Sequence, residues 1–97
     1  MDTILTTEKE LLEKIEGNIL LISGQVVVKN IEPDIAHCQL NTLSETVTAI
    51  VDQLEKNNVN YQQNKSFTLR LNVVRSHLAN AIEYTKELCN KLIKEKR

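Results

Sequence analysis

Apolar residues recur along this chain at alternating intervals of four and three, which is the pattern of helices that associate lengthwise. The pattern is longest in the last third of the chain, where Thr85 is the only polar member of the series. The mean interval of 3.5 keeps the apolar positions on one face and predicts a helix over about 65–95. The apolar members are Phe67, Leu71, Val74, Leu78, Ala81, Leu88 and Leu92.

A second series of the same kind precedes it and predicts a helix over about 33–57. Pro33 fits the first turn of this helix, where its missing amide hydrogen costs nothing. The series continues through the polar Asn57 to Tyr61. Its apolar members are Ala36, Leu40, Leu43, Val47, Ile50 and Leu54.

A third stripe predicts a helix over about 5–29, with Thr7 and Glu10 spaced as a capping box at its start. Gly17 weakens this helix by about 1 kcal/mol relative to Ala. Residues 18–29 leave an alternative open, because two apolar runs flanking Ser23-Gly24 also fit a short β-hairpin. The stripe consists of Leu5, Leu12, Ile15, Ile19, Ile22 and Val26.

The polar stretch between the second and third helices predicts a turn, after which Asn64 or Ser66 can cap the next helix. The last helix would be about 45 Å long at 1.5 Å per residue. That length exceeds the reach of a small globule, so we expect its far end to project and to seek a partner.

Together these elements predict one all-α domain over residues 1–97. The expected architecture is an antiparallel three-helix bundle, or a coiled-coil hairpin, with a long C-terminal helix. Only Phe67, Tyr61 and Tyr84 are aromatic, and scarce aromatic bulk suits a lengthwise seam of Leu, Ile, Val and Ala.

Charge is distributed unevenly. Residues 1–30 carry three Lys or Arg against five Asp or Glu, residues 31–64 carry one against five, and residues 65–97 carry eight against three. We interpret the basic third helix as the electrostatic complement of two acidic helices. The alternative is a tail that binds nucleic acid or an anionic membrane, made of Lys91, Lys94, Lys96 and Arg97. We do not expect such contacts, because Glu95 interrupts the basic run and no aromatic or Gly-rich element accompanies it.

The sequence offers little catalytic chemistry. It contains no phosphate-binding loop, dinucleotide fingerprint or HExxH motif. His37 and Cys38 are adjacent and point to different sides of a helix, while His77 and Cys89 lie about three turns apart. A zinc site between helices is conceivable, but the paired-ligand spacing is missing. We therefore expect no enzyme, no cofactor and no small-molecule substrate.

The cysteines and the chain start suggest a compartment. Neither thiol belongs to a CxxC pair, and no basic segment followed by an apolar stretch opens the chain. We expect a cytoplasmic, reducing environment with both thiols free.

The heptad-like seams are the best candidates for contacts with another protein. A second stripe on the last helix (Leu69, Val73, Ile82, Cys89, Ile93) would allow more than two neighbours. The other interpretation of the seams is an ordinary three-helix core. The candidate interface residues are Phe67, Leu71, Val74, Leu78, Leu88, Leu92, Leu40, Leu43, Val47, Ile50 and Leu54.

Residues 61–97, with Leu71-Asn72-Val73, Tyr84-Thr85-Lys86-Glu87-Leu88 and a Lys-rich end, resemble small coiled-coil subunits of the biogenesis of lysosome-related organelles complex. The resemblance covers about a third of the chain. It implies an all-helical, non-catalytic subunit of a cytosolic hetero-oligomer in endosome or lysosome trafficking. No individual functional residue can be carried over.

Two functional hypotheses follow. The first is an interaction subunit whose helices pair through the seams with other helical proteins or with a second copy. The second is a self-contained three-helix binding module, of the co-chaperone or adaptor type, that recognises another protein through a charged helical face.

Overall fold

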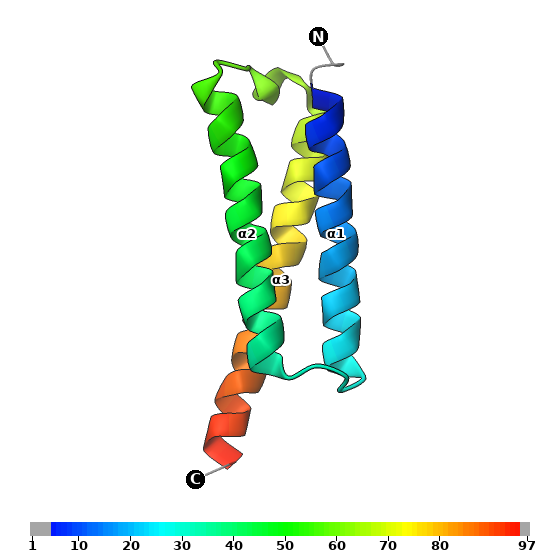
Figure 1. Cartoon of the computed structure of the whole chain (residues 1–97), viewed down its shortest axis with the longest axis vertical. Helices are drawn as coiled ribbons and strands as arrows, with labels where there is room; N and C mark the ends of the chain where they lie inside the picture. The colour runs from blue at the N-terminus through cyan, green and yellow to red at the C-terminus, as the bar shows by residue number, and fades with distance from the viewer. Residues whose placement is uncertain (1–4, 96–97) are drawn as a thin grey trace.

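The computed structural model describes residues 5–95, which form an antiparallel bundle of three helices (Figure 1). Helix α1 spans Thr6–Val27, α2 spans Pro33–Lys56 and α3 spans Lys65–Glu95, and a 3-10 turn, η2, covers Tyr61–Gln63. No strand occurs within residues 5–95. The predicted all-α three-helix bundle is confirmed, and the expected helix limits of 5–29, 33–57 and 65–95 lie within two residues of the observed ones.

The three apolar stripes meet in one continuous core. Within residues 5–95 it contains sixteen buried apolar residues, which are Leu5 and members of all three helices. The buried members are Leu5, Leu12, Ile15, Ile19, Ile22, Val26, Ala36, Leu40, Val47, Val51, Leu54, Phe67, Leu71, Val74, Leu78 and Ala81.

Residues 18–29 do not form the alternative hairpin. Ile15, Ile19, Ile22 and Val26 fall on one face of α1 and are buried together. A helix buries these four side chains in the shared core, whereas an isolated two-stranded hairpin would be marginal in water.

Val51 is a core residue that the strict 3.5-residue pattern missed. Val51 is 5% exposed, whereas the expected seam residue Ile50 is only partly buried against the core. A straight α-helix has 3.6 residues per turn, so its buried face drifts relative to a 3.5 repeat. About three turns beyond Leu40 the drift shifts the buried position by one residue, from Ile50 to Val51.

The predicted capping box at Thr7 and Glu10 is wrong. Helix α1 begins at Thr6, and its N-cap residue Leu5 makes no side-chain capping bond. Leu5 is instead 4% exposed and belongs to the core. Burial of this apolar side chain starts the helix earlier than the polar signal indicated.

Both connections begin with the same helix-ending motif. After α1, the amides of Lys29 and Asn30 donate to the carbonyl oxygens of Val26 and Gln25. After α2, Asn58 and Val59 make the equivalent bonds. Lys29 and Asn58 have positive φ angles of 62° and 58°, which this Schellman arrangement requires.

The bundle has two different ends. At the closed end, η2 carries the chain across from α2 to α3, beside the start of α1 (Figure 1). At the open end, residues 28–32 join α1 to α2 while α3 continues past them. Helix α3 has 31 residues against 22 in α1 and 24 in α2, which gives the molecule a long axis of 55 Å. The expected projection of the third helix is therefore present.

Candidate protein-interaction surface

The predicted interface residues lie mainly inside this chain's own core. Those nearly excluded from solvent are Phe67, Leu71, Val74, Leu78, Leu40, Val47 and Leu54. Leu43, Ile50 and Leu88 are partly buried against the same core, and Leu92 is exposed. In this fold most of the heptad-like seam joins the chain to itself, so a surface for other proteins has to be sought elsewhere.

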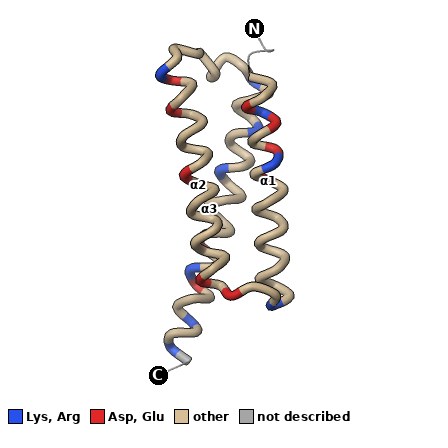
Figure 2. The backbone as a smooth tube through the Cα atoms, in the orientation of Figure 1, with Lys and Arg blue, Asp and Glu red and all other residues tan. Residues whose placement is uncertain are grey.

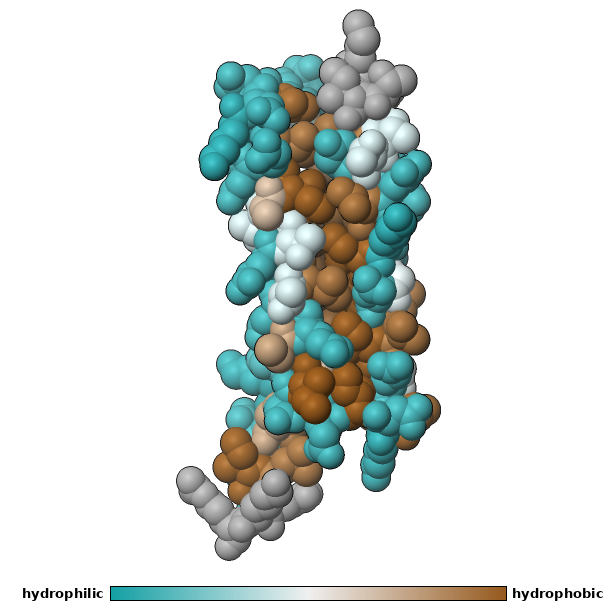
Figure 3. Space-filling view, in the orientation of Figure 1, coloured by the Kyte–Doolittle hydropathy of each residue, from teal (hydrophilic) through white to brown (hydrophobic). Residues whose placement is uncertain are grey.

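Exposed apolar side chains gather at the open end. Leu20, Leu21, Val27 and Val28 belong to the second half of α1 and its C-cap, and their side chains are between 59% and 65% exposed. Near them on the other helices are Ile35, Tyr84, Leu92 and Ile93. Figure 3 shows apolar surface on the outer edge of α1 and on the projecting part of α3. Among residues 5–95, the large exposed apolar residues nearer the closed end are Leu11 and Leu69.

The segments that carry Leu20, Leu21, Val27, Val28 and Ile35 lack charge. Residues 17–28, 35–44 and 76–82 contain no Asp, Glu, Lys or Arg, and Figure 2 shows the resulting uncoloured stretches of the three helices. The antiparallel topology places these stretches side by side. Exposed apolar groups without interspersed charge are a mark of interaction surfaces, since isolated monomers rarely keep large patches of this kind.

A groove of about 410 Å³ lies where α3 leaves the bundle. We call it the end groove and define it by Val26, Val27, Ile31, Pro33, Tyr84, Leu88 and Leu92, which come from all three helices and the first connection. Lys29, Glu32 and Lys91 stand at its polar edge. No salt bridge joins these three within the described residues, so their charges are available to a partner.

A shallower groove between α1 and α3 continues from the end groove. Val27 and Tyr84 line both, and Leu20, Ser23 and Asn80 extend the surface toward the middle of the bundle. Apolar contact area therefore runs along the side of the molecule as well as over its end.

The buried hydroxyl of Thr85 is satisfied within the bundle. Thr85 is 1% exposed, and its hydroxyl donates to the backbone carbonyl of Ala81 or Ile82. His37 Nδ1 and Thr85 Oγ1 are hydrogen-bonded at 2.8 Å. The polar seam position on α3 is thus satisfied by α2, an arrangement that fixes the register of the two helices.

A second polar cluster ties α1 to α3. Arg70 and Glu16 form a salt bridge of 2.7 Å, and His77 Nδ1 lies 3.6 Å from the other oxygen of Glu16. Arg70–Glu16 is the one Lys or Arg salt bridge among residues 5–95. The expected attraction between a basic helix and acidic neighbours is therefore realised at a single pair, and Lys96 and Arg97 lie outside the described residues.

The described residues contain no cluster of three metal-ligating side chains. Cys38 is exposed and Cys89 partly buried, and both thiols are free. His37 Nδ1 is hydrogen-bonded to Thr85 of α3, and His77 Nδ1 lies 3.6 Å from Glu16 Oε1 of α1 without a hydrogen bond.

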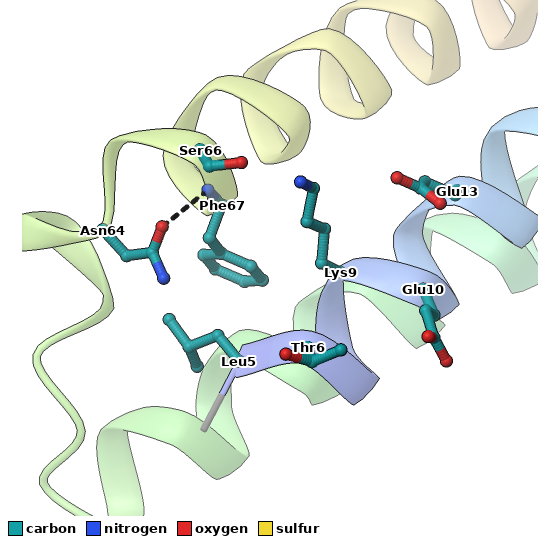
Figure 4. A pocket seen from close by; sticks show the side chains of 8 residues that line it. All are labelled: Leu5, Thr6, Lys9, Glu10, Glu13, Asn64, Ser66 and Phe67. Atoms are coloured by element: carbon teal, nitrogen blue, oxygen red, sulfur yellow. Dashed lines mark hydrogen bonds between the residues drawn. The ribbon is translucent and has the colours of Figure 1, made fainter. Parts of the chain in front are cut away.

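A second pocket, of about 390 Å³, lies at the closed end (Figure 4). Asn64 Oδ1 accepts a 3.0 Å hydrogen bond from the amide of Phe67, which caps α3 as predicted. Lys9 reaches from α1 toward the start of α3, with Glu13 near its ammonium group (Figure 4). A helix cap and neighbouring opposite charges account for these groups without a ligand.

Comparisons with known proteins do not extend this description. Within residues 5–95, no helix is long and apolar enough to cross a lipid bilayer. No family model, no curated protein and no solved structure matches this chain.

Proposed function

We propose that this chain is a non-catalytic helical interaction subunit that joins a larger protein assembly through the end groove. The observation that carries the proposal is the gathering of exposed apolar residues at the open end, which the described residues leave uncovered. The partner we expect is an amphipathic helix, because a groove between helices accepts apolar residues spaced at three and four.

The polar edge of the groove adds selectivity. Lys29 and Lys91 would attract acidic side chains of the docked helix, and Glu32 a basic one. Rim charges of this kind steer and orient a partner more than they add affinity.

The cytoplasm is the compartment we propose, since free thiols suit a reducing environment. A role in endosome or lysosome trafficking, which the resemblance implies, stays a prediction.

The alternative of a self-contained binding module also has a specific observation in its favour. The seams pack against one another in one shared core, as expected of a bundle that folds without a partner. The two hypotheses then differ in the surface used, since the alternative places recognition on a charged helical face instead of on the apolar end.

Photo-cross-linking at two leucines of α3 separates these surfaces. Leu92 lines the end groove at 38% exposure, whereas Leu69 is 67% exposed near the closed end. With p-benzoylphenylalanine at either position in cells that express the chain, we expect specific protein adducts at Leu92 and few at Leu69, despite the greater exposure of Leu69.

The matched substitutions Leu92→Asp and Leu69→Asp test the energetics with the partner so identified. Leu92→Asp should weaken binding by about tenfold or more, because it places a charge in an apolar contact, and Leu69→Asp should leave binding unchanged. Equal adducts at both positions, or equal affinities of both variants, would refute the assignment to the end groove.

A further inference from the structure

The outward face of α1 carries an alternation of glycine and large apolar residues that the bundle does not use. Gly17, Leu21, Gly24 and Val28 follow one another at intervals of four, three and four, and all are exposed. We call these four residues the α1 stripe. It lies opposite the buried face formed by Ile15, Ile19, Ile22 and Val26.

Nothing inside the chain requires the two glycines. A Cβ atom added at Gly17 or Gly24 would meet no other group within 4 Å, and neither residue has a positive φ angle. Glycine in a helix interior is destabilising relative to alanine. Their presence on the same stripe as Leu21, which is 59% exposed, and Val28, which is 64% exposed, needs a cause outside the chain.

We propose that the α1 stripe is a contact between two copies of this chain. The two α1 helices pack antiparallel about a two-fold axis that passes between residues 22 and 23. In this register Leu21 of each copy lies over Gly24 of the other, and Val28 lies over Gly17. Every large side chain meets a glycine, so the two backbones can approach closely and the side chains interdigitate.

A second copy is favoured because the α1 stripe is complementary to itself. Reversing the order glycine, leucine, glycine, valine places a large residue against a small one at every level, which an isologous two-fold contact demands. A parallel pairing in register would instead set Leu21 against Leu21 and leave Gly24 facing Gly24.

Charge supports the same register. Residues 17–28 carry no charge, so two copies can bring these segments together without repulsion. The antiparallel register places Lys29 of one copy within one turn of the level of Glu13 of the other, an exposed acidic residue on the outward side of α1. The basic residue at the end of the segment thus approaches an acidic residue that precedes the segment in the partner copy.

The size of the contact sets the expected strength. The stripe occupies about three turns, or on the order of 18 Å of helix, with Leu20 and Val27 beside it. The surface area buried by a contact of this length is smaller than the roughly 800 Å² per partner of a standard stable interface. We therefore expect a weak, reversible dimer. The proposal uses a different face of α1 from the end groove, so either assignment can fail without the other.

Replacement of a glycine by leucine gives a sharp test, because a merely adhesive apolar surface and an interdigitated seam predict opposite results. Gly24→Leu adds apolar area but fills the space needed by Leu21 of the other copy. We expect the dimer dissociation constant from sedimentation equilibrium to rise by about tenfold or more. Ala49→Leu, at an exposed position of α2, should leave it unchanged.

The outcomes of this experiment are distinct. Circular dichroism should show both variants fully helical, since leucine is a better helix former than glycine. Tighter dimerisation of Gly24→Leu, or a wild-type chain that stays monomeric at its highest soluble concentration, overturns the proposal. Partner binding through the end groove would be unaffected by either result.

Disulfide formation tests the antiparallel register directly. In a background with Cys38→Ser and Cys89→Ser, a chain with Leu21→Cys is mixed with a chain with Gly24→Cys. The disulfide between the two different variants should form several-fold faster than the disulfide between two copies of either variant. A disulfide needs Cα atoms within about 7 Å, and the proposed register brings residues 21 and 24 of different copies together. Faster self-pairing of the Leu21→Cys chain, or no disulfide at all, contradicts the register.

Discussion

At the closed end the outward residues of α1 are charged, whereas toward the open end the same face of the same helix carries glycine, leucine and valine. Glu10, Glu13 and Lys14 belong to the first half, and Gly17, Leu21, Gly24 and Val28 to the second. The inward stripe continues through both halves without interruption. The core thus requires apolar residues along the whole helix, whereas the outward residues differ in type between the two ends.

The difference also separates two kinds of apolar residue. Phe67, at the closed end, is of the enclosed kind: it is fully buried and meets the ring of Tyr61 edge-to-face at 5.8 Å between centroids. Leu92 and Ile93, in the projecting part of α3, are of the exposed kind, at 38% and 56%. An apolar residue of the enclosed kind contributes to folding, and we propose that one of the exposed kind contributes to association.

The largest expected effect comes from placing the same charge on each kind of residue within α3. Leu78→Asp buries a carboxylate at a position that is 3% exposed and should destabilise the fold by about 4 kcal/mol or more. Leu92→Asp should leave the free energy of unfolding within about 0.5 kcal/mol of the wild type. Urea denaturation followed by circular dichroism measures both.

This pair can break the distinction between the two kinds of residue. A folded Leu78→Asp chain with wild-type stability would mean that the bundle core is not the source of stability. Strong destabilisation by Leu92→Asp would mean that the projecting part of α3 contributes to the stability of the fold. Weaker binding by this variant could then no longer be assigned to loss of a surface contact.

The helices and their arrangement were predictable because periodicity depends on neighbouring residues only. Alternating intervals of four and three identified most of the buried positions, including Leu40, Val47, Phe67 and Leu78. The missed position, Val51, follows from the true helical period of 3.6. The capping box failed because burial of Leu5, a tertiary effect, outweighed a local hydrogen bond.

The candidate surface was less predictable. An apolar pattern has the same appearance whether the residues that cover it belong to the chain or to a partner, so the core was assigned to an intermolecular contact. The apolar run that also suggested a hairpin, residues 18–28, was a better signal. Apolar residues of this segment lie both on the face buried in the bundle and on the outward face. A helix that is apolar on both faces is typical of one that another protein also contacts.

A smaller effect is expected at the start of α3, where the closed end has a hydrogen-bonded cap. Asn64→Ala removes the side-chain oxygen that accepts from the Phe67 amide and should cost about 1 kcal/mol. Ser66→Ala, at the other residue that the sequence offered as a cap, should cost less than about 0.5 kcal/mol. Chemical denaturation of both variants is the measurement, and equal losses would show that the cap does not stabilise this end.

The smallest effect has the opposite sign and concerns the uncharged half of α1. Gly17→Ala should raise the free energy of unfolding by about 0.8–1 kcal/mol, because alanine favours the helix and its methyl group meets no other atom of the chain within 4 Å. For a domain of this size the thermal midpoint should rise by about 4–8 °C per kcal/mol. The melts have to be recorded at low concentration, where association does not contribute.

Ala49→Gly is the matched reverse substitution, at an exposed interior position of α2, and it should lower stability by a similar amount. If both changes behave as expected, the chain carries a glycine at position 17 at a real cost to its own fold. The same cost applies at position 24, where the Cβ is equally unobstructed. A residue that weakens the isolated bundle and leaves room on its surface makes physical sense where another helix occupies that room. A Gly17→Ala chain no more stable than the wild type would remove this reason for looking beyond the monomer.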